Sequence, residues 1–457
     1  YNAGSVTING GVLGGWAEGY GKSYAIYNSG YMEINGGMIE KVLPGSGYEV
    51  HGIYNYTKGQ LTINNGNIDS IYNYSLKDVE INGGDISEIH NWGNGKINVI
   101  DGNINCVYNQ YSYTTGNDNA KGTGIINIYK GNFKEIINGG LGNLNISDAT
   151  IKQIRNQGTG NLTLSNITIS EGLENADTAN VIINGGNISG SSYPVNQEGS
   201  GTIVINAGTI LGNKYGIYNQ NDGTIEVRNG DIQGKEIGIY NNTGTIVLGI
   251  KDGIVKNDEI SIYGKEKYGV SNYNGTFKFY DGEVKGIANA ISGSVYETDE
   301  NCSITLSNSE EEIASIVQNE NIAYINDNTE YTYSDLQTAV DACDAGDTIT
   351  LIKDISVTEI NKVLINEDDN ILLDMNGKSI ISFSKNGAIE NSGNLKIFAS
   401  SDGSKIFGNT DSIITNNGVL EIADIIIKNN VSKGIVNASK GNLKISGGTI
   451  IGRYGIY

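Results

Sequence analysis

Two histidines and three arginines are the side chains of this 457-residue sequence best suited to moving a proton near neutral pH or holding an anion. They are His51, His90, Arg155, Arg228 and Arg453. None of them belongs to a spacing that marks a nucleophile with its base, a cluster of metal ligands or a phosphate-binding loop. The sequence therefore predicts no catalytic residue, no metal site and no cofactor.

Aromatic side chains offer a second kind of chemistry, because their rings can pack against the apolar faces of sugars. Several stand in stretches where a repeating motif of the chain is interrupted by extra residues, and such insertions usually carry the binding residues of a repeat protein. The candidate ligand-binding residues are Trp16, Tyr20, Tyr24, Tyr48, His51, Tyr111 and Tyr113. The alternative is that tyrosine simply fills outward positions in a chain that has 28 of them.

The balance of charged residues limits the partners that this chain can bind. The sequence has 51 Asp and Glu against 30 Lys and Arg, which gives a net charge of −21. Nucleic acids and anionic membranes both attract basic surfaces, so this composition disfavours them as partners. The sequence holds no run of 18 apolar residues, and no membrane insertion is expected. Such a chain suits an extracellular or cell-surface location.

Asparagine recurs at one point of the repeating motif, which consists of an aliphatic residue, a variable residue and Asn, as in Ile53-Tyr54-Asn55. Many successive members are 18 residues apart, and the steps between Asn175 and Asn241 widen to about 21 to 23 residues. A period of this size predicts a solenoid. The series comprises Asn2, Asn28, Asn55, Asn73, Asn91, Asn109, Asn138, Asn156, Asn175, Asn196, Asn219, Asn241, Asn272, Asn289, Asn391, Asn416 and Asn437.

Each period also contains a short stretch of alternating apolar and polar residues that ends in a glycine turn, such as Glu80-Ile81-Asn82-Gly83-Gly84. The alternation indicates a strand, and the glycines supply the positive φ of a sharp corner. Two or three such strands in about 18 to 22 residues make one coil of a parallel β-helix. Stacked coils lie about 4.8 Å apart, so the asparagines are expected to form an internal ladder of amide hydrogen bonds.

The repeat also places the residues that could otherwise be taken for catalytic groups. His90, Arg155 and Glu174 fall at the variable position of the motif, which is tyrosine in many repeats, and this favours an outward structural role for all three. Paired acids such as Asp368-Asp369 are weak signs of a glycosidase. In stacked coils any two neighbouring carboxylates fall about 5 Å apart without selection for catalysis.

The repeat pattern divides the chain into three parts. Residues 1–308 are expected to form a first β-helix array, 309–347 a helical junction, and 348–457 the start of a second β-helix. In the junction, Ser309 begins a predicted helix that runs to Val317, and Ser334 caps a second helix over Asp335–Ala345. The second helix carries an apolar stripe of Leu336, Ala339, Val340 and Cys343. Such a helix is a suitable cap for the open end of a solenoid.

Three cysteines do not make a disulfide framework. Cys106 falls two residues before Tyr108, at a position filled in other repeats by Ser70 or Glu88, and is expected to face outward. Cys302 and Cys343 flank the junction, and whether they pair stays open.

The asparagine column, the coil length and the glycine turns resemble the right-handed parallel β-helices of the pectate-lyase-like superfamily. More narrowly, they resemble the repeat regions of clostridial-type surface proteins and adhesins. The resemblance implies an all-β, right-handed fold but does not fix an activity, because lyases, hydrolases and adhesins share it. Hydrolase members would use clustered Asp and a His-containing motif. Here Asn409-Thr410-Asp411 matches one fragment of that pattern and the remainder is missing.

The expected function is a non-enzymatic, extracellular structural or adhesive protein, a rigid stalk that presents loops to carbohydrate or to a neighbouring cell. Two alternatives remain open: a fibre subunit that stacks end to end, and a polysaccharide lyase or glycoside hydrolase whose site the sequence does not reveal. Tyr1 and Tyr457 both fall inside the repeat motif. This placement predicts that the chain is cut from a longer secreted polypeptide.

Overall fold

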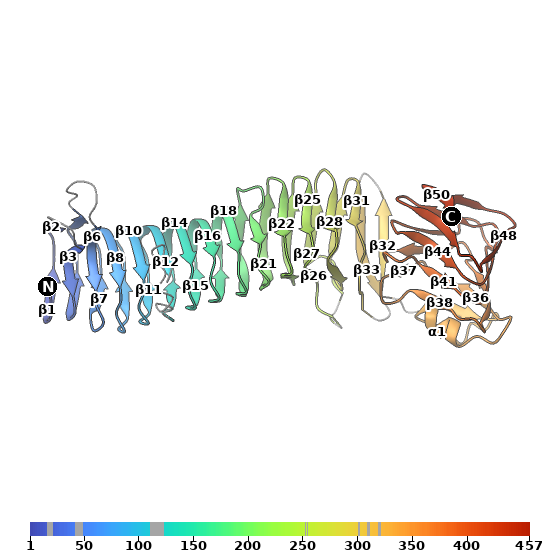
Figure 1. Ribbon diagram of the computed structural model, residues 1–457, viewed down its shortest axis with the longest axis horizontal. Coiled ribbons are helices and arrows are strands. Elements are labelled where there is room, and N and C mark those ends of the chain that lie inside the picture. Colours follow the sequence, from blue (N-terminus) through green and yellow to red (C-terminus); the bar gives the residue numbers. More distant parts are fainter. Residues whose placement is uncertain are drawn as a thin grey trace. The chain divides into compact units, whose positions relative to one another are not determined.

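The computed structural model describes residues 1–15, 22–41, 49–109, 123–251, 253, 255–299, 302–308, 311–318 and 321–457. They divide into two compact units, 1–235 and 236–457. Strands make up nearly all the regular structure, and the described residues contain one α-helix, α1 (Leu336–Asp341) (Figure 1). The predicted all-β solenoid is confirmed. The finer prediction of three parts, 1–308, 309–347 and 348–457, stays a prediction.

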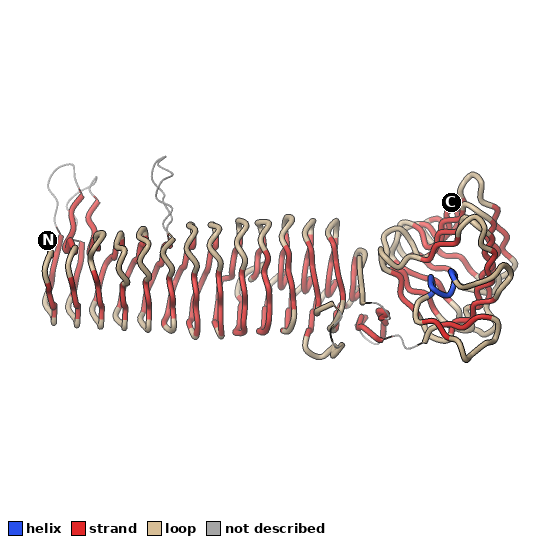
Figure 2. The backbone as a smooth tube through the Cα atoms, turned by 90° about the horizontal axis from the view of Figure 1, so that it is seen from below, coloured by secondary structure: helices blue, strands red, loops and turns tan. Residues whose placement is uncertain are grey.

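The first unit is a stack of coils whose strands pair in parallel with the strands of the coils before and after them (Figures 1 and 2). Its strands are β1 (Ser5–Ile8), β2 (Val12–Gly15), β3 (Lys22–Asn28), β4 (Tyr31–Ile34), β5 (Met38–Lys41), β6 (Glu49–Asn55), β7 (Gln60–Ile63), β8 (Asn67–Asn73), β9 (Val79–Ile81), β10 (Asp85–Asn91), β11 (Ile97–Val99), β12 (Asn103–Asn109), β13 (Ile126–Ile128), β14 (Gly131–Asn138), β15 (Leu144–Ser147), β16 (Ala149–Asn156), β17 (Leu162–Ser165), β18 (Ile167–Asn175), β19 (Val181–Ser189), β20 (Val195–Gln197), β21 (Thr202–Gly212), β22 (Tyr215–Asn219), β23 (Thr224–Val227) and β24 (Gly230–Gly234).

Alternation within each strand builds the core of this unit. In β9, for example, Val79 and Ile81 are fully buried and Glu80 between them is half-buried. The register keeps equivalent residues in columns, so that Ile81 of β9 lies beside Val99 of β11. An isolated coil could not bury these side chains, and stacking the coils removes them from water.

Glycine is required at the corners of the coils. Gly84 has φ of 107°, and a Cβ atom there would lie 2.8 Å from the carbonyl oxygen of Gly66 in the preceding coil. Any other residue would meet both the strained φ and this close backbone approach. The glycine turns seen in the sequence therefore allow neighbouring coils to approach this closely at their corners.

The second unit contains the remaining strands and α1. Its strands are β25 (Ile237–Asn241), β26 (Thr245–Leu248), β27 (Ile260–Gly264), β28 (Tyr268–Asn272), β29 (Thr276–Phe279), β30 (Glu283–Gly286), β31 (Asn289–Ser292), β32 (Cys302–Asn308), β33 (Glu312–Gln318), β34 (Ala323–Ile325), β35 (Thr332–Tyr333), β36 (Thr348–Leu351), β37 (Ile355–Val357), β38 (Val363–Ile365), β39 (Asn370–Asp374), β40 (Ser379–Ser382), β41 (Ile389–Asn391), β42 (Asn394–Phe398), β43 (Lys405–Gly408), β44 (Ser412–Asn416), β45 (Val419–Ile422), β46 (Ile426–Asn429), β47 (Lys433–Asn437), β48 (Asn442–Ile445), β49 (Thr449–Ile451) and β50 (Tyr454–Ile456). From β36 onward they form a solenoid whose coils contribute one strand to each of three parallel sheets.

The predicted helix from Ser309 to Val317 is wrong, because β33 covers most of that stretch and pairs antiparallel with both β32 and β30. Ser309 itself lies outside the described residues. Ala314 and Ile316 are buried and Ser315 between them is half-buried, a period of two. Burial on one face of a sheet has prevailed over the local capping signal.

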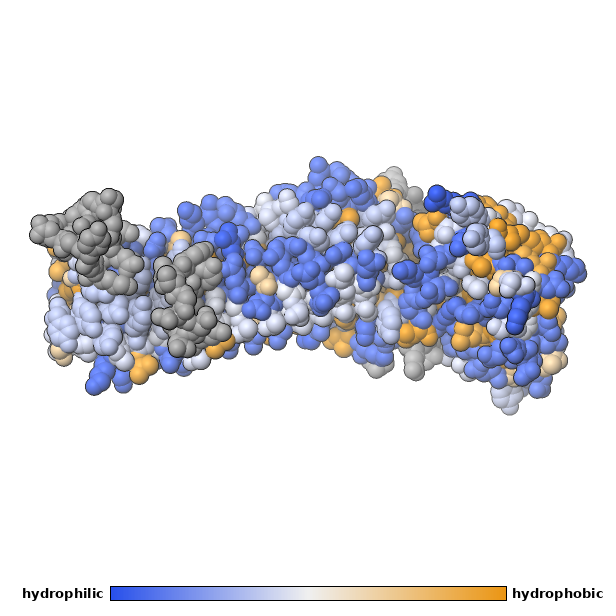
Figure 3. Space-filling model, viewed as in Figure 1, coloured by the Kyte–Doolittle hydropathy of each residue, from blue (hydrophilic) through white to orange (hydrophobic). Residues whose placement is uncertain are grey.

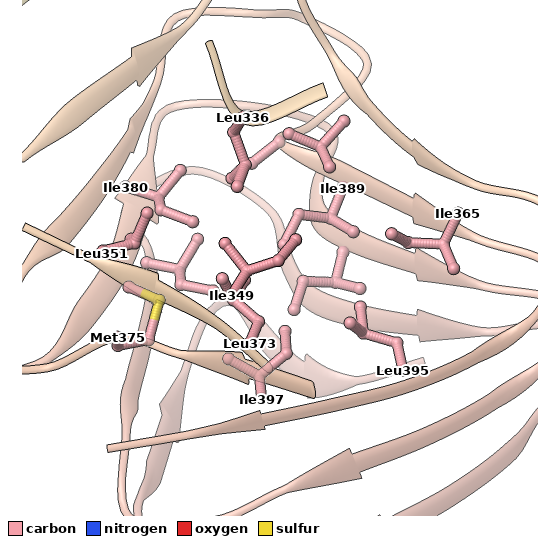
Figure 4. Packing of buried hydrophobic residues seen from close by; sticks show 14 of the residues in the cluster. Leu336, Ile349, Leu351, Ile365, Leu373, Met375, Ile380, Ile389, Leu395 and Ile397 are labelled. Carbon is pink, nitrogen blue, oxygen red and sulfur yellow. The ribbon is translucent and has the colours of Figure 1, made fainter. Parts of the chain in front are cut away.

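The second predicted helix is confirmed but is shorter than expected. Asp335, not Ser334, is its N-cap: the Asp335 carboxylate accepts a hydrogen bond from the Thr338 N–H at 2.9 Å. The helix ends at Asp341 instead of reaching Ala345. Leu336, Ala339 and Val340 are buried, and partly buried Cys343 packs with them against the core of the C-terminal solenoid. Figure 4 shows Leu336 beside the core residues of this solenoid. The helix therefore covers apolar residues that the first strands of this solenoid would otherwise expose.

Candidate functional site

The most extensive polar construction in the first unit is the buried column of asparagines. In each link an asparagine Nδ2 donates to the side-chain amide oxygen of the next member, over 2.8 to 3.1 Å. Several Nδ2 groups also bond a backbone carbonyl, as Asn175 does with Ala179 at 2.9 Å. The links run from Asn2 through Asn28, Asn55, Asn73, Asn91, Asn109, Asn138, Asn156 and Asn175 to Gln197.

Two predicted members of this column are wrong. Asn196 is half-buried and lies in register with Glu174 and Tyr218, while buried Gln197 takes the ladder place. In the motif the ladder residue comes two positions after the aliphatic residue. Applied to Val195-Asn196-Gln197, this spacing selects Gln197. Asn289 is half-buried and lies in register with Tyr268.

The other predicted members occupy ladder positions. Asn219 is buried and lies in register with Gln197. In the second unit Asn241 donates to Asn272 at 2.8 Å. The Asn272 Nδ2 then bonds the backbone carbonyls of Gly275 and Ser294, so this column ends there. Asn391, Asn416 and Asn437 form a separate column in the C-terminal solenoid, with links of 2.8 and 2.7 Å.

The outward column predicted for His90, Arg155 and Glu174 is confirmed by the strand register. His90 lies between Tyr72 and Tyr108, and further along the column Arg155 pairs with Glu174. Cys106 also takes its expected outward column, next to Glu88 and Glu135. All three cysteines are free thiols, so the Cys302–Cys343 disulfide is not formed.

Aromatic rings in this outward column stack on one another. The His90 ring lies 4.3 Å from the ring of Tyr72, with 7° between their planes, and 4.6 Å from the ring of Tyr108. The rings of Tyr54 and Tyr74 also stack, with their centres 5.0 Å apart. Burial among these rings raises the pKa of Tyr54 to about 12. Because neighbouring rings cover both faces, members inside a stack expose edges and no face on which a sugar could lie.

Only two of the predicted ligand-binding residues lie in the described part of the chain. Tyr24 and His51 are brought together, with ring centres 5.4 Å apart. His51 is buried and also contacts Tyr72 at 4.0 Å, so it serves the stack and is not a surface group. Trp16, Tyr20, Tyr48, Tyr111 and Tyr113 lie outside the described residues.

A groove of about 190 Å³ that the sequence did not reveal lies where β18 departs from the regular coil. The register of β16 and β18 shifts after Ile151, so that Gln153 lies opposite Gly172, whose φ is 109°. Such bulges re-aim the side chains around them. The groove is lined by Gln153, Glu171, Gly172, Leu173, Glu174, Ser191, Ser192, Tyr193 and Asn196.

Two carboxylates border this groove in different electrostatic settings. The Glu171 carboxylate forms an ion pair with the Lys152 ammonium group at 3.0 Å. Burial raises the pKa of Glu174, and the negative charge of Glu198 raises it further, while Arg155 opposes the shift. A carboxyl with a raised pKa can act as a general acid, which is the one chemical property here that a hydrolase would use.

The raised pKa of Glu174 predicts how Glu174→Gln will behave. A carboxyl whose pKa is higher in the folded than in the unfolded chain adds stability below the unfolded value of about 4.3, and that contribution is lost as the pH rises through the folded pKa. Glu174→Gln should therefore raise the melting temperature at pH 7 and leave it nearly unchanged at pH 4. Circular dichroism melts at both pH values measure this. Glu171→Gln is the control, since it breaks an ion pair and should not stabilise; equal effects of the two variants at pH 7 would contradict the assignment.

Other features of the described residues offer less. The second unit has a cavity of about 570 Å³ whose lining includes Asp299, Asp335 and Lys362. The described residues contain no group of three or more His, Cys, Asp or Glu placed to hold a metal ion, and α1 is too short to cross a membrane. Hydrophilic residues cover much of the face seen in Figure 3, in keeping with the acidic composition.

No protein-family model matches this chain, and neither the curated proteins nor the solved structures contain a match.

Proposed function

We propose that this chain is a rigid, non-enzymatic stalk of an extracellular bacterial surface protein, whose outer faces contact glycans or a neighbouring cell. The unbroken side-chain ladder from Asn2 to Gln197 carries the proposal. Each link is worth about 1 kcal/mol net, and it adds to the backbone hydrogen bonds of the parallel sheets. Bending a coil away from its neighbour would break links of several kinds at once.

The dimensions of the first unit suit a spacer. It has eleven ladder positions, from Asn2 to Asn219, and ten steps of about 4.8 Å give roughly 50 Å. Stacked aromatic rings on the outside, such as Tyr72 and His90, reinforce the same axis. The resemblance to the pectate-lyase-like superfamily and to clostridial-type surface proteins supports the bacterial, extracellular assignment, and the net charge of −21 suits a soluble surface.

A second candidate function, glycoside hydrolysis, is favoured by one observation: Glu174, with its raised pKa, shares a groove with Glu171. In such a hydrolase Glu174 would protonate the leaving oxygen and Glu171 would act as base or nucleophile. The ion pair between Glu171 and Lys152 counts against this function because it occupies the second carboxylate.

Electron microscopy and an activity assay on the same preparation test the proposal. We expect single particles that contain a straight segment of roughly 50 Å whose length does not vary. A segment that bends from particle to particle would overturn the stalk, and filaments that lengthen with protein concentration would favour a fibre subunit instead. Incubation with neutral polysaccharides, and with polygalacturonate and Ca²⁺, should release no reducing ends or unsaturated products. Release that disappears in Glu174→Gln would establish the hydrolase.

A further inference from the structure

One outward column of the first unit changes from asparagine to large apolar or aromatic side chains at Ile100 and Tyr129. Its exposed asparagines, Asn35, Asn64 and Asn82, are linked by side-chain hydrogen bonds of 2.6 and 2.7 Å. Ile100 and Tyr129 are the next two members of this column. They directly follow Val99 of β11 and Ile128 of β13, which are register partners. Both Ile100 and Tyr129 are exposed, and Tyr129 has 50% of its surface open to solvent.

The two positions after Tyr129 in this column are serines. Ser147 and Ser165 are register partners in β15 and β17, and the Ser147 hydroxyl donates to the backbone carbonyl of Tyr129 at 3.3 Å. Among the described residues no aromatic ring stacks on Tyr129, in contrast to Tyr72. Because serine is short, neither Ser147 nor Ser165 can stack on the Tyr129 ring, and a groove of about 220 Å³ lined by all three residues lies there.

A directed chain of amides borders the groove. Asn145 donates to Asn127 at 2.9 Å, and Asn127 donates to Asn98 at 2.8 Å. Asn98 then donates to the carboxylate of Glu80 at 2.6 Å. An ionised carboxylate can only accept, so Glu80 fixes the orientation of all three amides.

This chain leaves an acceptor at its free end. Within the described residues the Asn145 Oδ1 receives no hydrogen bond, and the next residue in the column, Thr163, also lines the groove. Bonds that run in one direction polarise one another, which makes the terminal oxygen a better acceptor than an isolated amide. A ligand hydroxyl is the complementary donor.

We propose that this groove binds one pyranose ring of an uncharged glycan. The apolar face of the sugar packs on the open face of Tyr129, and a sugar hydroxyl donates to the Asn145 Oδ1. The two serine positions span two coils, about 10 Å along the axis, which is room for one such ring. Tyrosine is the one titratable residue in the lining, which is Asn127, Ile128, Tyr129, Asn145, Ile146, Ser147, Thr163 and Ser165, and this favours a neutral sugar over a polyanion. The assignment rests on the proposed surface function, to which it adds a ligand class and a place.

Saturation-transfer difference NMR on the full chain tests the site. The probes are tetraoses of glucose (both linkages), mannose and N-acetylglucosamine, with a tetragalacturonate as the acidic comparison. We expect transfer to at least one neutral probe and none to the acidic one. Tyr129→Ala should weaken the affinity roughly tenfold or more, because it removes the ring against which the apolar face of the sugar packs. Tyr129→Phe keeps the ring face and should bind as the parent does.

Two controls separate the site from the fold and from the stalk. Tyr273→Ala removes a tyrosine that is 69% exposed elsewhere in the chain, and it should leave affinity and melting temperature unchanged. Asn145→Leu removes the acceptor at the end of the amide chain and should also weaken binding. Binding that survives Tyr129→Ala, or a preference for tetragalacturonate, would overturn this site while leaving the stalk intact. If no neutral probe binds, the site is refuted, and the microscopy still decides the stalk independently.

Discussion

Asn91→Ala should lower the free energy of unfolding of the first unit by roughly 2 to 6 kcal/mol. Asn91 is fully buried; it accepts from Asn73 at 3.0 Å and donates to Asn109 at 3.1 Å. Alanine would leave a donor of Asn73 and an acceptor of Asn109 buried without a partner, and each such group costs about 1 to 3 kcal/mol. The ladder makes the loss larger than that of one typical hydrogen bond.

Asn82→Ala is the matched control in the same stack of coils. Asn82 also donates to an asparagine one coil away, Asn64, at 2.7 Å, but this link lies on the exposed surface. Water can replace the lost partner there, so the cost should stay below about 1 kcal/mol. Scanning calorimetry of the full chain measures both variants. Similar losses for Asn82→Ala and Asn91→Ala would show that the internal ladder contributes nothing beyond ordinary surface bonds.

The ladder was predictable because its cause is local and periodic. A buried amide that must bond the coils on either side fixes both the residue type and the spacing, and the sequence displays both. The mistakes at Asn196 and Asn289 have different causes. Asn196 lies one place before the ladder position, and a one-residue shift turns a strand residue to the opposite face. Asn289 pairs with Tyr268, four places before Asn272, so it begins β31 and does not reach the ladder position. Gln197 fills the ladder place because its amide supplies the same donor and acceptor.

The two grooves could not be predicted, for different physical reasons. The groove beside Glu174 depends on the register shift between β16 and β18 that follows the Ile151–Ile169 pair. Such a bulge arises from the pairing of two strands, and the sequence of one repeat does not show it. The groove beside Tyr129 depends on the next two side chains of that column, which are serines instead of further rings. Aligning the repeats at every outward position, in addition to the internal asparagine position, would have placed Tyr129 next to Ser147. The prediction of a helix from Ser309 to Val317 failed because a capping signal carries no information about the sheet that β33 joins.

Gly190→Ala should destabilise the first unit strongly and distort the groove beside Glu174. Gly190 has φ of 96°, and a Cβ atom there would lie only 1.6 Å from the backbone carbonyl oxygen of Ser170. Alanine would meet the conformational strain, about 1 to 3 kcal/mol, together with a clash that only backbone movement can relieve. Because Ser191, Ser192 and Tyr193 come directly after it and line the groove, that movement should displace its wall.

Gly185→Ala isolates the clash from the strain. Gly185 has φ of 111°, close to that of Gly190, but the nearest atom to its added Cβ would be the Ala207 Cβ at an ordinary 4.0 Å. The two variants share the strain, so the difference between them reports the clash, which we expect to exceed about 2 kcal/mol. In a unit of this size that corresponds to roughly 4 to 8 °C between their melting temperatures. Equal melting temperatures would mean that the Ser170 carbonyl moves aside freely and that the Gly190 turn does not hold the wall of the groove in place.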